Sequence, residues 1–294
     1  MRLMRTGFWL LALASPSAAF GQQAAPIIAV LEQAQCAPDT SLSIRPLFVK
    51  TDRGWDSLAT VAAQSRLPSG PQTWTIAFNG RMLGRVESAR PVAYVGDSDW
   101  YSRDWHLNTA PMALPLPRIP NRKQRFEGWC AAPPFRPLVL ISKPFFEDPA
   151  RWTLSPPTPT LRQALLARVH TATGPLVFCP QNDTVAVPYR YRAADLVISD
   201  SYRDRRGRRL VSLGVDPSRY GCDGLVEQGW APQWFLLGTD TLYLGCQMDL
   251  VDAGDYGHDG VSELLFWYSG YNEDGYVLYT DTGRRLAAYL WHYH

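Results

Sequence analysis

Proline and glycine interrupt this chain too often for it to form long helices. Its 294 residues include 24 prolines and 22 glycines, and both residue types break helices or mark turns. Aromatic residues, which favour strands, make up 12% of the chain. The composition therefore predicts a mainly β protein made of short antiparallel hairpins and meanders.

Two segments have the pattern of a β-hairpin. Residues 73–78 and 82–86 flank the dipeptide Asn79-Gly80, which readily adopts the positive φ of a two-residue hairpin turn. Residues 195–215 carry strand-like runs on either side of an arginine-rich stretch centred on Gly207. We expect that stretch to be a hairpin tip with solvated arginines, because a charge run is usually a solvated surface.

The C-terminal part and one internal segment complete the expected elements. Residues 263–293 predict a meander of three strands with turns at 272–275 and 281–283. Thr160 to Thr171 predicts one short surface helix that starts at Thr160 and stops at Gly174-Pro175. Its apolar face at helical spacing would consist of Leu161, Ala164, Leu165 and Val169.

The first 21 residues have the features of a secretory signal peptide. Arg2 and Arg5 precede an apolar run at 8–14, and small residues follow up to a cleavage point after Gly21. We therefore expect a secreted or periplasmic protein, with residues 22–294 as a single domain and a possible internal boundary in the proline-rich stretch 144–159. No later window is apolar enough for a membrane-spanning helix.

Charge and cysteine content exclude some classes of protein. Removing the signal peptide takes away two arginines and leaves 27 basic and 27 acidic residues, so a nucleic-acid partner, which needs a basic footprint, is not expected. The five cysteines have no C-x-x-C spacing, which argues against a zinc or dithiol site. Disulfides are permitted after export, and the pairs nearest in sequence are Cys222 with Cys246 or with Cys179. The cysteines are Cys36, Cys130, Cys179, Cys222 and Cys246.

An acidic loop carries the most specific chemical signal. The stretch DYGHDGVSE, residues 255–263, places carboxylates at intervals in a glycine-containing turn that runs into an apolar strand. A hard cation such as Ca²⁺ needs several oxygen ligands at short range. The candidate ligands are the side chains of Asp255, Asp259 and Glu263, the carbonyl of Val261 and, as an additional carboxylate, Asp252. The alternative is a polar turn that satisfies itself through local hydrogen bonds.

This stretch resembles the calcium loops of FG-GAP and VCBS-type repeats, which occur in integrin-like β-propellers and secreted bacterial proteins. The resemblance covers about residues 249–270 and departs at Gly257, where the pattern has Asp or Asn. It implies a structural calcium ion, a propeller-like arrangement as one option beside a sandwich or meander, and a role in binding or adhesion at the cell envelope. Gly257 removes one carboxylate, so we expect weak affinity, about 10⁻⁴ to 10⁻³ M.

A second cluster suggests a different class of function. Asp97, Asp99, Asp104 and His106 lie among Trp100, Tyr101 and Trp105. Carboxylates beside aromatic rings are what a glycoside-cleaving site needs. However, the sequence contains no established catalytic motif, which favours a protein without catalytic activity. The leading hypothesis is an exported calcium-containing module that binds a carbohydrate or protein ligand, and the alternative is a carbohydrate-active enzyme using the 97–106 cluster.

Overall fold

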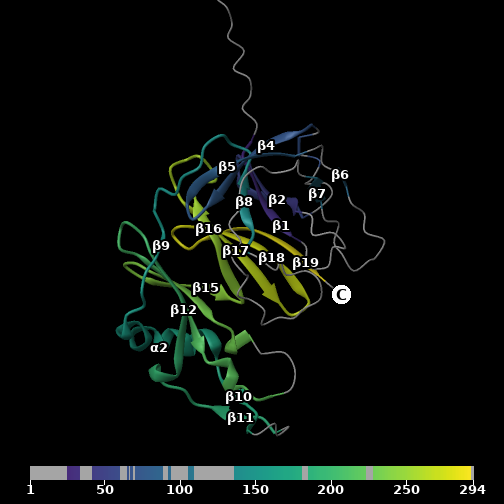
Figure 1. Ribbon diagram of the computed structural model, residues 1–294. Coiled ribbons are helices and arrows are strands. Elements are labelled where there is room, and N and C mark those ends of the chain that lie inside the picture. Colours follow the sequence, from purple (N-terminus) through teal and green to yellow (C-terminus); the bar gives the residue numbers. More distant parts are fainter. Residues whose placement is uncertain are drawn as a thin grey trace, which may run out of the picture.

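The computed structural model describes residues 25–33, 42–59, 65, 67–68, 70–88, 92–93, 105–108, 136–180, 185–222 and 228–292. Strands dominate these residues, and α2 (Pro159–Thr173) is their one long helix (Figure 1). All strand pairings among them are antiparallel. The prediction of a mainly β fold with one short surface helix is confirmed.

The N-terminal part forms an eight-stranded sheet in the order β5-β4-β8-β1-β2-β7-β6, with β3 paired to β2. β8 lies between β4 and β1, so this sheet joins strands that are far apart in the sequence. Its strands are β1 (Ile27–Gln33), β2 (Leu42–Thr51), β3 (Gly54–Ser57), β4 (Gln72–Phe78), β5 (Arg81–Ser88), β6 (Val92–Ala93), β7 (Trp105–Asn108) and β8 (Leu138–Ile141).

Two further sheets follow. A five-stranded sheet has the order β15-β14-β13-β12-β9, and a four-stranded sheet has the order β16-β17-β18-β19. The strands of the first are β9 (Thr153–Leu154), β12 (Leu196–Arg203), β13 (Arg209–Val215), β14 (Gln233–Leu237) and β15 (Thr241–Cys246). Those of the second are β16 (Met248–Gly254), β17 (Glu263–Gly270), β18 (Glu273–Thr280) and β19 (Arg285–His292). β10 (Leu176–Phe178) and β11 (Val187–Tyr189) form a separate ribbon.

The predicted hairpins and meander are confirmed. β4 and β5 are joined by Asn79 and Gly80, with φ of 51° and 70°, and β12 and β13 pair as the 195–215 pattern indicates. In the meander, β18 already begins at Glu273, so the first turn is shorter than expected. The arginine-rich tip is only partly solvated, because Arg208 forms ion pairs with Asp204 and Asp281.

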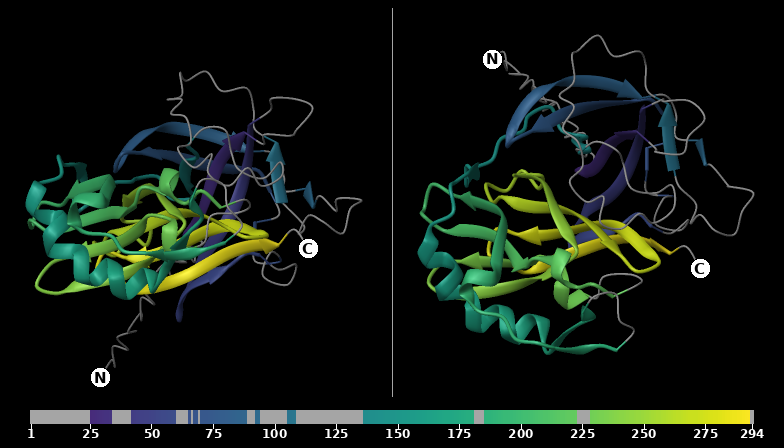
Figure 2. Two further views of the ribbon diagram at one scale, coloured as in Figure 1. Left: turned by 90° about the horizontal axis from the view of Figure 1, so that it is seen from below. Right: turned by 60° about the horizontal axis from the view of Figure 1, so that its bottom comes forward.

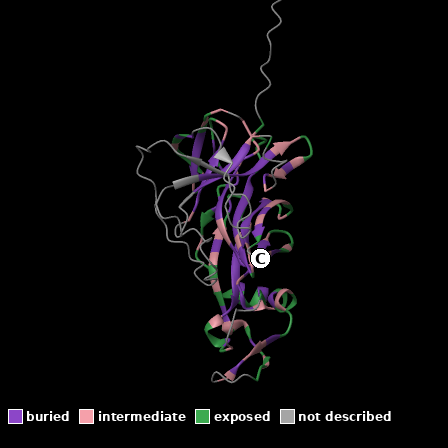
Figure 3. Ribbon diagram, turned by 90° about the vertical axis from the view of Figure 1, so that its right-hand side faces the viewer, coloured by how far each residue is buried: buried purple, intermediate pink, exposed green. Residues whose placement is uncertain are grey.

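The four-stranded sheet is the central layer of the molecule (Figure 2). Alternate residues of β17 point to opposite faces, as in any strand. Leu265 and Trp267 pack into the core shared with the N-terminal sheet, whereas Leu264 and Phe266 pack into the core shared with the five-stranded sheet. Burial on both faces explains the unbroken apolar run in this strand, and Figure 3 shows the buried residues following the strands.

The described residues do not form the ring of four-stranded blades that a propeller requires.

α2 covers the outer face of the five-stranded sheet. Leu161, Leu165 and Val169 are buried there, together with Val211 and Phe235. The expectation that Ala164 shares this face is wrong, because Ala164 is exposed. The helix also starts before Thr160: it begins at Pro159, with Thr158 as the cap residue, because proline's fixed φ suits the first helical position. Gly174 ends it at a φ of 63°, as predicted.

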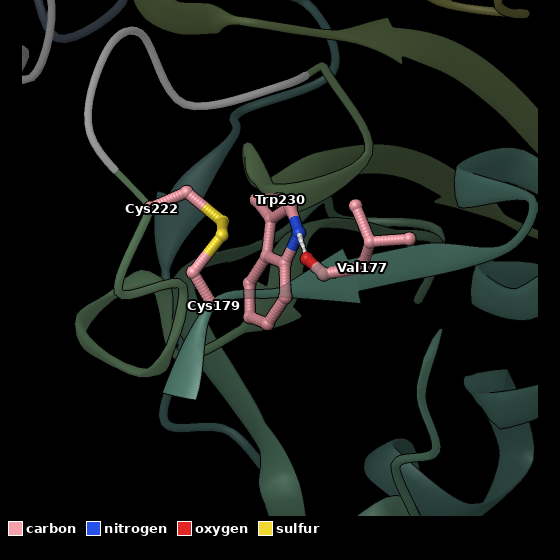
Figure 4. Close-up of a disulfide and its surroundings, with 4 residues drawn as sticks. All are labelled: Val177, Cys179, Cys222 and Trp230. Carbon is pink, nitrogen blue, oxygen red and sulfur yellow. Dashed lines mark hydrogen bonds between the residues drawn. A yellow bond between two sulfur atoms is a disulfide. The ribbon is translucent and has the colours of Figure 1, made fainter. Parts of the chain in front are cut away.

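One disulfide ties the β10–β11 region to the loop after η4 (Pro217–Arg219). Cys179 bonds to Cys222, one of the two pairs that the sequence suggests, whereas Cys246 forms no disulfide with a described cysteine. Beside it, the Trp230 indole of η5 (Gln228–Trp230) donates a hydrogen bond to the carbonyl of Val177 at 3.0 Å (Figure 4). The remaining short helix is η3 (Ala193–Asp195). Cys36 and Cys130 lie outside the described residues.

No helix in the part of the chain that the structure describes is long and apolar enough to cross a membrane. Residues 1–21, the expected signal peptide, lie outside that part.

Candidate functional site: the β16–β17 loop

The loop between β16 and β17 folds around the carboxylate of Asp255. This carboxylate accepts hydrogen bonds from the backbone N–H groups of Asp259, at 3.0 Å, and Gly260, at 2.8 Å. Asp259 in turn accepts one from the N–H of Val261 at 3.1 Å. These are the local hydrogen bonds of a self-satisfied polar turn. His258, at the tip, is exposed, and its φ of 55° places it in the left-handed region.

Glu263 closes the loop and is buried at the start of β17, with 3% of its surface exposed. Its two oxygens accept hydrogen bonds from the indole N–H of Trp55, at 3.1 Å, and from the backbone N–H of Tyr256, at 2.9 Å. Burial raises the pKa of this carboxyl to about 7, although both hydrogen bonds act to lower it. The negative charge of Asp259 adds to the increase, and Lys50 opposes it. Glu263 is therefore a carboxyl that changes charge near neutral pH.

Lys50, at the end of β2, brings a positive charge to the loop. Its Nζ lies 3.4 Å from Oδ2 of Asp259 and 5.1 Å from the centre of the Trp55 ring. A Cβ placed on Gly257 would lie 3.0 Å from this Nζ, 3.2 Å from Oδ2 of Asp259 and 3.2 Å from Oε1 of Glu263. An ammonium and two carboxylates therefore converge on the space that the missing side chain of Gly257 leaves open.

This arrangement gives a physical reason for a glycine at position 257, where the FG-GAP and VCBS-type pattern has Asp or Asn. A Cβ at position 257 would lie within 3.0 to 3.2 Å of the ends of these three side chains, so they would have to shift to admit it. Sequence reasoning missed Lys50 because 209 residues separate it from Asp259. The pairing of β2 with β3, which places Lys50 opposite Trp55, brings it to the loop.

Asp252 faces a different part of the molecule. It lies in β16 with 5% of its surface exposed, and its Oδ1 accepts hydrogen bonds from the N–H groups of Gly80, at 3.0 Å, and Ala253, at 2.8 Å. Its Oδ2 lies 3.8 Å from Nη2 of Arg136. Burial raises the pKa of Asp252 to about 6, with Arg136 opposing the increase. The structure thus gathers Asp259 and Glu263 around Gly257 and directs Asp252 toward the β4–β5 turn.

Among the described residues, no group of three or more His, Cys, Asp or Glu side chains is placed to hold a metal ion. The side chain of Val261 is exposed, and its backbone N–H donates a hydrogen bond to Asp259. Calcium at this loop stays a prediction.

The alternative cluster falls largely outside the part of the chain that the structure describes. Asp97, Asp99 and Asp104 lie outside it, and His106 is described only as a backbone position of β7, opposite Val92 of β6. The prediction of a glycoside-cleaving site at 97–106 therefore stays a prediction.

One polar centre was not anticipated from the sequence. Asp148 accepts hydrogen bonds from the backbone N–H groups of Ala150, at 3.0 Å, and Trp152, at 2.6 Å, and from the hydroxyl of Ser262. It joins the segment before β9 to the end of the β16–β17 loop. An aspartate followed by proline indicates a turn, but only the long-range contact with Ser262 reveals this role.

The fold and the loop together define a mainly β protein of stacked antiparallel sheets. The end of the β16–β17 loop is held by buried polar contacts of Glu263 and Ser262. Comparisons of this chain with protein-family models, with curated proteins and with solved structures find no match. The resemblance of residues 249–270 to FG-GAP and VCBS-type repeats thus stays a prediction.

Proposed function

We propose that this chain is an exported binding or adhesion module of the cell envelope in which the β16–β17 loop takes up calcium as a structural ion. The observation that supports the proposal is the convergence of Lys50, Asp259 and Glu263 on the open space at Gly257. Asp259 already pairs with a cation there, the ammonium of Lys50, whose charge also acts on Glu263. A calcium ion would replace that ammonium. The negative charge of the loop would then be balanced by Lys50 in the absence of calcium and by the ion in its presence.

In the calcium form, oxygen atoms of Asp255, Asp259, Glu263 and Val261 would bind the ion, because Ca²⁺ requires oxygen ligands. Asp255 would have to exchange its hydrogen bonds to Asp259 and Gly260 for the ion. This exchange and the displacement of Lys50 both oppose binding, which agrees with the weak affinity expected from the sequence. The charge of bound calcium would favour the ionised form of Glu263.

The first test is thermal unfolding of the mature protein in millimolar CaCl₂, in millimolar MgCl₂ and in excess EDTA. A ligand that binds only the folded state stabilises it by RT ln(1 + [L]/Kd), so we expect a higher melting temperature in calcium alone. Asp259→Ala should abolish the increase. Asp240→Ala, which removes an exposed aspartate from the β14–β15 turn, should retain it. Coincident melting curves for the parent in calcium and EDTA would reject the proposal.

The role of Lys50 has a separate test. Lys50→Met keeps an apolar side chain of similar length on Trp55 and removes the competing charge. We expect the calcium-induced shift to be larger in this variant than in the parent, because the ion no longer has to displace an ammonium. A shift that is unchanged or smaller would mean that Lys50 does not occupy the calcium position.

A further inference from the structure

Three buried polar atoms lack a hydrogen-bond partner where β16 meets the β4–β5 turn. They are Oδ2 of Asp252, the hydroxyl oxygen of Tyr256 and Nε of Arg136, and none of them has a hydrogen-bond partner among the described residues. Tyr256 is completely buried. Buried polar groups in proteins are nearly always hydrogen-bonded, so each exception requires an explanation.

The three side chains are fixed by other contacts. The guanidinium of Arg136 donates to Oδ1 of Asn79 at 2.9 Å and lies 4.8 Å from the centre of the Phe78 ring. The ring of Tyr256 stacks on Phe146 at a centroid distance of 5.4 Å. Asp252 is held by Gly80 and Ala253 through its other oxygen. A change of rotamer that joined them directly would therefore break existing contacts.

The three groups also lie within one another's electrostatic field. Burial raises the pKa of Tyr256, the charges of Asp252, Glu263 and Asp148 raise it further, and Arg136 opposes the increase. The phenol is thus a permanent O–H donor. Nη2 of Arg136 lies 3.8 Å from Oδ2 of Asp252, which is close enough for an ion pair but too long for a direct hydrogen bond. A gap of this length between polar groups is one that a water molecule commonly bridges.

We propose that an ordered internal water molecule binds between Asp252, Tyr256 and Arg136. The water would donate to Oδ2 of Asp252 and accept from the hydroxyl of Tyr256 and from Nε of Arg136. A buried water typically makes about three such bonds. A neutral molecule suits this position, because Arg136 disfavours a metal cation and Asp252 disfavours an anion. The water would link the β4–β5 turn, the segment before β8 and the central sheet.

A crystal structure of the mature protein, at a resolution that places ordered waters, tests the proposal directly. We expect a density peak within hydrogen-bonding distance of both Oδ2 of Asp252 and the hydroxyl of Tyr256. A direct hydrogen bond between these two side chains, or no peak between them, would overturn the proposal.

Chemical denaturation of matched variants tests it independently. Tyr279→Phe removes a buried hydroxyl that donates to the carbonyl of Leu244 at 2.7 Å, and we expect its unfolding equilibrium constant to rise about fivefold to tenfold. Tyr256→Phe should cause a rise of the same order if the hydroxyl binds water. A Tyr256→Phe variant as stable as the parent, or more stable, would show that this hydroxyl has no partner and would contradict the proposal.

Discussion

Individual residues in this protein have roles that depend on what they meet across the sheets. Glu263 and Asp252 both belong to the central layer, and both accept hydrogen bonds from the N-terminal sheet, through Trp55 and Gly80. Each carboxyl is buried and has a raised pKa. These residues therefore join two layers at the cost of placing negative charge in a buried environment.

The raised pKa of Glu263 predicts a specific pH dependence of stability. Between its ordinary value of 4.5 and its folded value of about 7, the folded state holds a proton that the unfolded state has lost. The stability from this group is therefore complete below pH 4.5 and is lost as the pH rises through about 7, by roughly 3 kcal/mol at most. Asp252 contributes in the same direction, over the lower window between its ordinary value of 3.8 and its folded value of about 6.

Glu263→Gln tests this dependence by urea denaturation in EDTA from about pH 5 to about pH 8. We expect the free energy of unfolding to fall less steeply with pH than in the parent, even though the amide loses one of the two accepted hydrogen bonds, at about 1 kcal/mol. Glu147→Gln, which neutralises an exposed carboxylate, should leave the slope unchanged. Equal slopes for Glu263→Gln and the parent would show that Glu263 does not titrate in this range.

Gly80 is required for both the turn and the docking of the turn. Its φ of 70° is unfavourable for other residues, and an added Cβ would lie 2.7 Å from Cβ of Asp148. We expect Gly80→Ala to cost about 2 to 4 kcal/mol, from backbone strain and from overpacking. Gly207→Ala is the matched control, because Gly207 has a φ of 85° but only the end of the Arg203 side chain nearby, at 3.5 Å. Equal losses in the two variants would exclude the docking contribution.

At the scale of elements, the chain combines local hairpins with long-range connections. β4 with β5, β12 with β13 and the β17–β19 meander each pair neighbours in sequence. The β10–β11 ribbon also pairs consecutive strands, and in addition the Cys179–Cys222 disulfide and the hydrogen bond from Trp230 to Val177 tie it to later parts of the chain. Local turns therefore define the hairpins, and covalent and side-chain contacts hold the ribbon against the core around α2.

Removing the disulfide should destabilise the protein. The bond closes a loop with a sequence separation of 43 residues, which corresponds to about 4 kcal/mol of lost entropy in the unfolded chain. We expect the double variant Cys179→Ser with Cys222→Ser to lose up to this amount in urea denaturation. Cys246→Ser, which removes a cysteine that is not part of this disulfide, is the control for the loss of a cysteine and should have a much smaller effect. A double variant as stable as this control would contradict the prediction.

At the scale of the whole molecule, three sheets and a helix stack in four layers, with the β16–β19 sheet between the other two. Polar links reinforce the apolar interfaces. Arg208, in the turn of the β12–β13 hairpin, donates to the carboxylates of Asp204 and Asp281, each at 2.7 Å. The bond to Asp281 crosses from the five-stranded sheet to the turn that precedes β19, so this ion pair connects two layers.

Arg208→Met should therefore weaken the interface between these sheets. Charged hydrogen bonds contribute about 1.5 to 3 kcal/mol each when they are shielded from solvent, and the side chain of Arg208 is 18% exposed. We expect a loss of about 2 kcal/mol in the free energy of unfolding. Arg206→Met, at an exposed position of the same turn, should change stability by less than about 0.5 kcal/mol. Similar small changes in both variants would mean that the ion pair contributes little.

The sequence by itself determined the fold class, the Asn79-Gly80 hairpin, the meander, the position of α2 and the tight acidic turn, because these depend on local φ preferences and on the spacing of apolar residues. Only the tertiary structure decided that β8 inserts between β4 and β1, that Cys179 pairs with Cys222, and that Lys50 meets Asp259 while Asp252 faces Gly80. Those contacts join residues far apart in the chain, and they depend on how the layers stack. Local propensities do not encode that stacking, since it is fixed by the burial of both faces of the central sheet.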